Sequence, residues 1–295
     1  MLAYDMPLYR PPSEGDNLIV QATLGCSFNR CGFCSMYRSK TFSVRPLEEV
    51  EHDVRRAAAV WPEAHRVFLA DGDAMTLPAD HLHAILDILH AHLPRLARVS
   101  AYATPANILK KTPEELVALR ARKLSLVYIG VESGDADMLK RITKGASPRG
   151  IATALNKARD CGIKTSATVI LGLGGRTHWR KHIEGTAQVI NEAPPNFLST
   201  LQLYLEPERR TDFLDTFAKQ GDAFVPQDDL AVLDELETLL RLLAPPRPVI
   251  FRSNHASNAL PLAGTLPKDS QRLADTVKAA RAGLVGMRPA HRRSL

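Results

Sequence analysis

The sequence predicts an α/β protein, a partial (β/α)6 TIM-like barrel with a C-terminal extension, and three observations lead to this fold class. Short apolar segments alternate with helix-like segments from about residue 17 to the end, which is the pattern of repeated βα units. Polar or glycine-rich residues follow most of the apolar segments, as expected where the carboxyl ends of parallel strands form a site. A chain of 295 residues with 45% apolar content can bury one large core.

The predicted strands are short, apolar and often β-branched or aromatic. They cover residues 18–23, 66–70, 99–103, 126–131, 164–171, 198–205 and 248–252. We expect helices in the gaps between them. Thr112-Pro113-Glu114-Glu115 supplies an N-cap, a proline at the first helical position and a glutamate for a capping box. Residues 45–49 have a similar pattern and predict another helix start.

We expect one enzyme domain made of three consecutive parts. Residues 1–16 form an N-terminal arm, residues 17–205 form the barrel core, and residues 206–295 form a C-terminal extension that closes the barrel and shapes the substrate site. The chain contains no internal repeat, low-complexity tract or long linker that would divide the core.

Composition restricts the location and the partners that we expect. The sequence has no run of about 18 apolar residues, and its first residues lack the basic and apolar regions of a signal peptide. We therefore predict a cytoplasmic protein with no membrane partner. The formal net charge of +6 favours an anionic partner such as a nucleic acid. An arginine-rich composition along the whole chain explains the same charge, so a nucleic acid is not the favoured partner.

Three of the four cysteines lie close together, with the spacing Cys26-x4-Cys31-x2-Cys34. Thiolates are soft ligands that suit an iron–sulfur cluster or zinc. Structural zinc and electron-transfer clusters normally take four protein ligands, whereas three leave one metal position open to a cofactor or substrate. The spacing therefore favours a catalytic cluster, and zinc with a remote histidine stays an alternative. Cys161 stands alone before Gly162 and is typical of a buried thiol at a helix end.

Residues 24–37 resemble the cluster loop of the radical S-adenosylmethionine (radical SAM) superfamily, including the aromatic Phe33 before the last cysteine. The usual spacing in that superfamily is C-x3-C-x2-C. The extra residue between Cys26 and Cys31 resembles a little-characterised branch often labelled iron–sulfur oxidoreductase. The resemblance implies that Cys26, Cys31 and Cys34 bind a [4Fe–4S] cluster whose open iron chelates S-adenosylmethionine.

Three further motifs occur in the order that the superfamily has. Asp71-Gly72-Asp73 follows the second predicted strand and resembles a Gly-Gly-Glu-like motif, in which Asp73 matches the acid that binds the methionyl ammonium. Residues 130–134 and 169–175 are similar to the motifs after the fourth and fifth strands. The alternative for Asp73 is an acid that caps the helix expected to start near Pro78. The cofactor-binding residues implied by the resemblance are Phe33, Asp71, Gly72, Asp73, Glu132, Ser133, Leu171 and Gly172.

The resemblance implies an oxidoreductase or transferase in which reductive cleavage of S-adenosylmethionine gives a 5′-deoxyadenosyl radical. That radical would abstract hydrogen from a small or medium-sized substrate, and the cluster would need a reducing partner such as flavodoxin or ferredoxin. Two enzyme alternatives are a radical enzyme that modifies tRNA or another nucleic acid, and a tetrapyrrole enzyme akin to coproporphyrinogen oxidase. Outside enzymes, the alternatives are an iron–sulfur redox carrier and a zinc-binding module.

Polar residues directly after the last predicted strand form the candidate substrate site. We predict that His255 is catalytic and that Arg252, Asn254 and Asn258 bind the substrate, because a polar run beyond a strand end faces the mouth of a barrel. A hydrogen-bonded surface turn is the alternative.

Two other polar features predict only solvated surface. His178 and His182 are four residues apart on a predicted helix, and we expect both on its solvent-facing side, because no glutamate follows His178 as in a zinc-binding helix. The basic tail, residues 281–293, is expected to be a frayed terminus.

Overall fold

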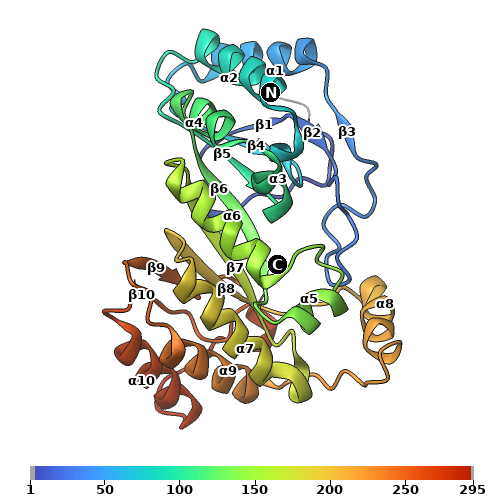
Figure 1. Ribbon diagram of the computed structural model, residues 1–295, viewed down its shortest axis with the longest axis vertical. Coiled ribbons are helices and arrows are strands. Elements are labelled where there is room, and N and C mark those ends of the chain that lie inside the picture. The colour runs from blue at the N-terminus through green and yellow to red at the C-terminus, as the bar shows by residue number, and fades with distance from the viewer. Residues whose placement is uncertain (1–3, 294–295) are drawn as a thin grey trace. The chain divides into compact units, whose positions relative to one another are not determined.

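The computed structural model describes residues 4–293, and eight of its strands share one mostly parallel sheet (Figure 1). These strands are β1 (Leu18–Gln21), β4 (Arg66–Ala70), β5 (Arg98–Ala103), β6 (Leu124–Glu132), β7 (Lys164–Leu171), β8 (Phe197–Gln202), β9 (Val249–Arg252) and β10 (Ala263–Leu266). A small antiparallel pair joins β2 (Thr23–Leu24) to β3 (Ser43–Val44).

Helices occupy most of the connections between the strands. They are α1 (Leu47–Val60), α2 (Ala79–His92), α3 (Pro105–Lys110), α4 (Pro113–Ala121), α5 (Ala136–Arg141), α6 (Pro148–Asp160), α7 (Gly175–Glu192), α8 (Pro207–Ala218), α9 (Asp229–Leu242) and α10 (Ser270–Arg281). Short 3-10 turns cover Pro12–Glu14, Ala74–Thr76 and Ala290–Arg292. This alternation of strand and helix is the arrangement that the apolar pattern predicts.

The first of two compact units takes in the chain to Asn29 and the segments Cys34–Ile129 and Lys157–Thr165. Within it, β1 pairs in parallel with β4, β4 with β5, and β5 with β6. The central β4 is an apolar run buried on both faces, as parallel strands between helices require. Parallel pairing puts the carboxyl ends of β1 and β4 at the same edge of the sheet, so the loops that follow these two strands become neighbours.

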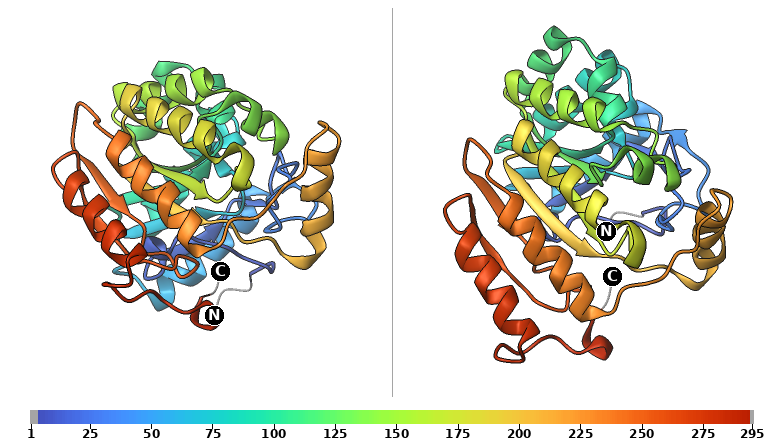
Figure 2. Two further views of the ribbon diagram at one scale, coloured as in Figure 1. Left: turned by 90° about the horizontal axis from the view of Figure 1, so that it is seen from below. Right: turned by 60° about the horizontal axis from the view of Figure 1, so that its bottom comes forward.

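The second unit comprises Arg30–Phe33, Gly130–Asn156 and Ser166–Leu295. Here β7, β8 and β9 run parallel, and β10 closes the order with an antiparallel pairing to β9. The helices α7, α9 and α10 pack side by side along this unit (Figures 1 and 2). Leucines on the inner side of α9, among them Leu239 and Leu240, are fully buried, so the apolar stripe of this helix holds it against its neighbours.

Most predicted strands agree with the structure to within two residues, and the predicted capping box at Thr112 is confirmed at the start of α4. β8 ends at Gln202, three residues before the predicted end at residue 205. The helix predicted from residues 45–49 forms as α1, but no side chain caps it. In the part of the chain that the structure describes, no helix has the length and apolar character to cross a membrane.

Candidate functional site

The loop that carries the first cysteine is joined to the turn after β4 by four hydrogen bonds. The backbone N–H of Gly25 donates to Asp71 Oδ2 at 3.0 Å, and the N–H of Gly72 donates to the Gly25 carbonyl at 3.0 Å. Ser27 donates its N–H to Asp73 Oδ1 at 2.8 Å and its hydroxyl to Asp73 Oδ2 at 2.5 Å. The two predicted acids therefore fix the backbone on both sides of Cys26.

Asp71 is fully buried and has further partners on β1 and on the cysteine loop. Gln21 Nε2 donates to its Oδ1 at 3.2 Å, and Lys40 Nζ lies 2.8 Å from Oδ2. Lys40 also lies 2.9 Å from a carboxylate oxygen of Asp5. Burial lowers the pKa of Lys40, but the hydrogen bonds and charges of Asp71 and Asp5 outweigh it and raise that pKa above its ordinary value. A buried carboxylate with this many donors is a structural anchor.

Gly72 brings the turn into direct contact with Cys26. A Cβ atom at this position would lie 2.5 Å from Cys26 Cβ and 2.8 Å from Cys26 Cα, well inside van der Waals distance. Only glycine leaves room for the turn and the cysteine to meet in this way. The structure thus gives Gly72 a steric role beside Cys26, and its contact with the cofactor stays a prediction.

The three clustered cysteines are half-buried, and no cysteine of the chain forms a disulfide. Cys26 and Cys34 belong to the first unit, and Cys31 to the short segment Arg30–Phe33 of the second. Burial and the nearby Asp73 raise the pKa of Cys26, while the backbone N–H groups of Asn29 and Phe28 act in the opposite direction by hydrogen bonding to its sulfur. A bound metal would displace this proton and hold the thiolate.

The donor set fits an iron–sulfur cluster by its chemistry, because three thiols share one loop and each iron of a cluster takes one thiolate. Among residues 4–293, no three His, Cys, Asp or Glu side chains surround a common point for a single metal ion. Phe33 is half-buried beside the last cysteine in sequence. Cys161 is buried after α6, as predicted for a helix-end thiol.

The alternative role of Asp73 as a helix-capping acid is wrong. The helix that follows, α2, has Pro78 at its N-cap and no side-chain cap, and Asp73 makes no capping hydrogen bond to the turn Ala74–Thr76 either. Both carboxylate oxygens accept from Ser27 instead. A carboxylate has about four acceptor positions, so Asp73 keeps capacity for a further cationic donor.

In the second unit, Glu132 ends β6 and Ser133 begins the loop after it, and both are buried. Glu132 has a φ of 62° and pairs with Lys144, whose Nζ lies 2.9 Å from Oε1. Ser133 is fully buried, and its hydroxyl oxygen lies 2.7 Å from His182 Nδ1. The sequence motif is thus held by partners on α7 and in the loop after α5.

Leu171 is the last residue of β7, and Gly172 begins the loop after it with a φ of 81°, which favours glycine. Its N–H donates to both carboxylate oxygens of Glu235 at 3.0 and 3.1 Å. His182 is fully buried next to this pair, so the prediction of a solvated His182 is wrong. Sequence reasoning missed Glu235, because a lone acid in an amphipathic helix gives no local sign of burial.

The polar run after β9 divides into a buried and an exposed part. Asn258 is buried, and its amide accepts from the Gln202 N–H at 2.8 Å and from the Ser257 hydroxyl at 3.3 Å. It donates to the Thr200 carbonyl at 2.7 Å and to Ser253 Oγ at 3.0 Å. These four bonds fill the capacity of the amide, and they fasten the loop to the end of β8.

His255 is half-buried, and Arg252 and Asn254 are exposed. The Ser257 N–H donates to His255 Nδ1 at 3.2 Å, and Ser257 Oγ lies 2.8 Å from the same ring nitrogen. Burial, together with the charge of Arg288, lowers the pKa of His255. Nε2 has no hydrogen-bond partner among residues 4–293, which leaves this ring nitrogen free for a hydrogen bond.

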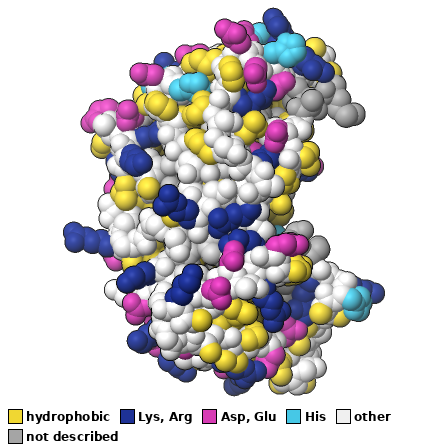
Figure 3. Space-filling view, turned by 90° about the vertical axis from the view of Figure 1, so that its right-hand side faces the viewer, with side chains coloured by type: hydrophobic (Ala, Val, Ile, Leu, Met, Phe, Trp, Pro, Cys, Tyr) yellow, Lys and Arg dark blue, Asp and Glu magenta, His cyan; other side chains and the backbone are white. Residues whose placement is uncertain are grey.

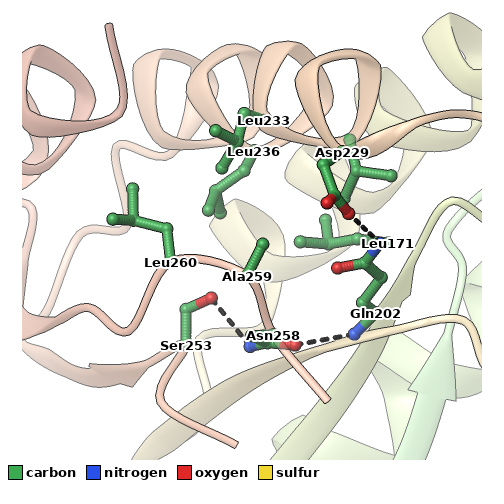
Figure 4. Close-up of a pocket in the computed structure, with 10 residues that line it drawn as sticks. Leu171, Gln202, Asp229, Leu233, Leu236, Ser253, Asn258, Ala259 and Leu260 are labelled. Carbon is green, nitrogen blue, oxygen red and sulfur yellow. Dashed lines mark hydrogen bonds between the residues drawn. The ribbon is translucent and has the colours of Figure 1, made fainter. Parts of the chain in front are cut away.

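A small cavity lies between β7, β8, α9 and this loop (Figure 4). Leu171, Leu233, Leu236 and Leu260 line its apolar side. Figure 4 shows Asn258 bonded to Ser253 and Gln202, and Gln202 to Asp229. The cavity has room for about one water molecule, ≈10 Å³, so it is packing space rather than a substrate site.

The C-terminal tail is held through its arginines, so the prediction of a frayed terminus is wrong for the described part. Arg293 makes a two-point ion pair with Asp229 at 2.7 and 2.6 Å. Arg288 donates to the carbonyls of His255, Ala256 and Asn258 at 2.9, 2.9 and 3.2 Å. On the face shown in Figure 3, Lys and Arg side chains are interspersed with acidic ones.

Comparison with known proteins identifies a family for more than half of the chain. The family model described as the radical SAM superfamily matches residues 20–188. Among curated proteins, the heme chaperone HemW of Bacillus subtilis is 24% identical over 176 residues, which cover 59% of this chain and 45% of that protein. The chain therefore spans less than half the length of this relative.

Solved structures give the same fold. Coproporphyrinogen III oxidase (HemN) of Escherichia coli aligns with a TM-score of 0.59 and 19% identity, over 76% of this chain and 52% of that chain. The radical S-adenosylmethionine methyltransferase TsrM of Kitasatospora setae, with cobalamin and a [4Fe–4S] cluster bound, aligns with a TM-score of 0.57 and 15% identity, over 90% of this chain and 59% of that chain. These likenesses confirm the predicted α/β partial-barrel fold class.

Proposed function

This chain belongs to the radical SAM superfamily, whose cofactors are a [4Fe–4S] cluster and S-adenosylmethionine, and on this premise we propose that Cys26, Cys31 and Cys34 are the cluster ligands. Three thiolates leave one iron open to the amino and carboxylate groups of S-adenosylmethionine. When bound there, the cluster and S-adenosylmethionine would supply reductive carbon–sulfur bond cleavage and hydrogen abstraction from a substrate, and the three cysteines would hold the cluster for that chemistry.

The observation that supports this role best is the four-bond contact between residues 25–27 and 71–73. It fixes Cys26 before any cofactor arrives, and a metal site on a rigid support loses less entropy on binding. Asp73 lies in the same contact and keeps two acceptor positions. We propose that it accepts the methionyl ammonium, because charge-assisted hydrogen bonds are the stronger kind.

The loops after β6 and β7 supply the rest of the proposed cofactor site. Glu132 and Ser133 would approach the polar parts of S-adenosylmethionine, and Leu171 and Gly172 would pack beside its adenine. All four are buried and held by hydrogen bonds, ion pairs or close packing. Held in this way, these groups orient the cofactor without rearranging when it binds. Phe33 and Gly72 complete the proposed set.

We propose that the segment 206–295 shapes the substrate site and that His255 acts there. Its Nε2 has no hydrogen-bond partner among the described residues, burial lowers the pKa of its ring, and its sequence neighbours Arg252 and Asn254 are exposed. Asn258 holds the loop, and a substrate contact from its amide would require one of its four present bonds to break.

The favoured substrate is a small or medium-sized molecule, with the electron supplied by a flavodoxin or ferredoxin in the cytoplasm. On the face shown in Figure 3, basic and acidic side chains are mixed, so this face gives no reason to prefer a nucleic acid. A pure redox carrier or a zinc module would have no use for an acid beside the cluster loop or for ordered loops after β6 and β7. Hydrogen abstraction by an enzyme uses all of them.

The proposal is tested by anaerobic reconstitution of the wild type, Cys31→Ala and a control, Cys161→Ala. The wild type and the control should bind about four iron atoms per chain and form 5′-deoxyadenosine from S-adenosylmethionine and dithionite. Cys31→Ala should stay folded by circular dichroism, lose most of its iron and form no 5′-deoxyadenosine. Full cleavage by Cys31→Ala, or none by the wild type with a complete cluster, would contradict the proposal.

A further inference from the structure

A buried carboxylate from the C-terminal half reaches the loop after β7. Glu235 on α9 is fully buried and accepts the Gly172 N–H through both of its oxygens, at 3.0 and 3.1 Å. Its Oε1 also lies 3.3 Å from His182 Nε2. A carboxylate without water is costly unless it has such partners, so its position is tied to β7 and α7.

His182 connects this carboxylate to the loop after β6. Its Nε2 lies 3.0 Å from the carbonyl oxygen of Ile170, which can only accept, so Nε2 carries a proton. Its Nδ1 lies 2.7 Å from Ser133 Oγ, and that oxygen also accepts the Asp135 N–H at 3.0 Å. One buried ring therefore joins Ser133 to Glu235.

The loop after β6 has little freedom to move against α7. The Gly134 N–H donates to Thr186 Oγ1 at 2.8 Å. A Cβ atom on Gly134 would lie only 2.1 Å from the Gly185 carbonyl oxygen. The backbone of this loop is already in close contact with α7. A change at Glu235 that shifts His182 must therefore shift this backbone as well.

We propose that Glu235 is a positioning residue for S-adenosylmethionine: it sets the place of Gly172 directly and of Ser133 through His182, and so determines the affinity for this cofactor. The inference rests on the proposed function, in which these two loops contact S-adenosylmethionine. Glu235 lies outside residues 20–188, which the family model matches. The C-terminal segment thus serves the cofactor as well as the substrate.

Glu235→Gln tests the proposal, because it keeps the size of the side chain and places an N–H₂ group against the Gly172 N–H. The matched control is Glu237→Gln, on the same helix, which breaks ion pairs with Arg241 and Arg281 without touching either loop. The first readout is hydrogen exchange in the cofactor-free protein. The Gly172 amide should exchange faster in Glu235→Gln and at the wild-type rate in Glu237→Gln.

The second readout is the dissociation constant of S-adenosylmethionine, from a titration of the electron paramagnetic resonance signal of the reconstituted, reduced protein. Glu235→Gln should weaken binding about tenfold, which corresponds to about 1.4 kcal/mol, and cleavage at saturating S-adenosylmethionine should stay within about twofold. Glu237→Gln should bind as the wild type does. Wild-type affinity in a folded Glu235→Gln overturns the inference.

A second variant covers the case in which Glu235→Gln does not fold. Glu235→Asp keeps the charge but withdraws it by one methylene, and it should show intermediate exchange at Gly172 and an intermediate affinity. Wild-type values for both would overturn the inference. Failure of the proposed function is a different result, since a wild-type protein with a complete cluster would then neither bind nor cleave S-adenosylmethionine.

Discussion

Gly72→Ala is the sharpest steric test of how the cluster loop is held. The added methyl carbon would lie 2.5 Å from Cys26 Cβ, 2.8 Å from Cys26 Cα and 3.0 Å from the Gly25 carbonyl oxygen. Carbon atoms in contact normally lie about 3.5–4.0 Å apart, so the turn and the loop must separate by about 1 Å. None of the three close atoms is the end of a flexible side chain, because Cys26 Cβ is itself fixed by the backbone, so a rotamer change cannot relieve the clash.

The separation acts on all four hydrogen bonds between residues 25–27 and 71–73, which now measure 2.5 to 3.0 Å. Overpacking of this kind costs about 1–3 kcal/mol. In a chain of 295 residues that lowers Tm by about 2–5 °C. The larger effect should be on iron binding, because Cys26 would shift by about 1 Å relative to the other two cysteines.

The assay is iron and sulfide content after anaerobic reconstitution, with Gly286→Ala as the control. A Cβ on Gly286 would meet no atom within 4 Å, so this variant should match the wild type in iron content and Tm. Gly72→Ala should retain less than about a third of the iron and of the 5′-deoxyadenosine formed, as expected when a ligand is displaced. A full cluster in Gly72→Ala with unchanged cleavage would refute the steric account of this site.

Three further outcomes follow from the same contacts. Asp73→Asn replaces one acceptor oxygen with a donor opposite Ser27 and should raise the KM for S-adenosylmethionine about tenfold; an unchanged KM would exclude Asp73 from cofactor binding. His255→Ala should still cleave S-adenosylmethionine but no longer convert substrate, and normal coupling between the two would remove His255 from the site. The pKa of folded His255 lies below its ordinary value, so between these two pKa values the unfolded chain binds more protons and stability falls as the pH is lowered. The drop in Tm between about pH 7.5 and pH 5.5 should be smaller in His255→Asn than in the wild type. An equal drop in both proteins would contradict the lowered pKa of His255.

The fold could be predicted from local patterns because parallel strands between helices are continuous apolar runs. β4 and β7 were predicted with their observed ends. β10 was not predicted, since the short Ala263–Leu266 segment has little apolar character and forms only by antiparallel pairing with β9. The pairing of β2 with β3 is another long-range contact that leaves no local pattern.

The candidate site was predictable where residues next to each other in sequence do the work, as in residues 71–73. Its supports were not, because Lys40, His182 and Glu235 reach the motifs from other elements. His182 shows most clearly what a local sequence pattern cannot predict. Helical spacing alone favoured a solvated side chain, and only the packing of α7 against the loop after β6 buries it.

The central claim, a three-cysteine cluster with one iron open to S-adenosylmethionine, is tested most directly by electron paramagnetic resonance of the reduced, reconstituted wild type with and without S-adenosylmethionine. The account predicts a [4Fe–4S] signal whose g-values change on addition of S-adenosylmethionine, because the cofactor binds the open iron. A protein that takes up zinc and no iron, or a cluster whose signal does not respond to S-adenosylmethionine, would contradict it.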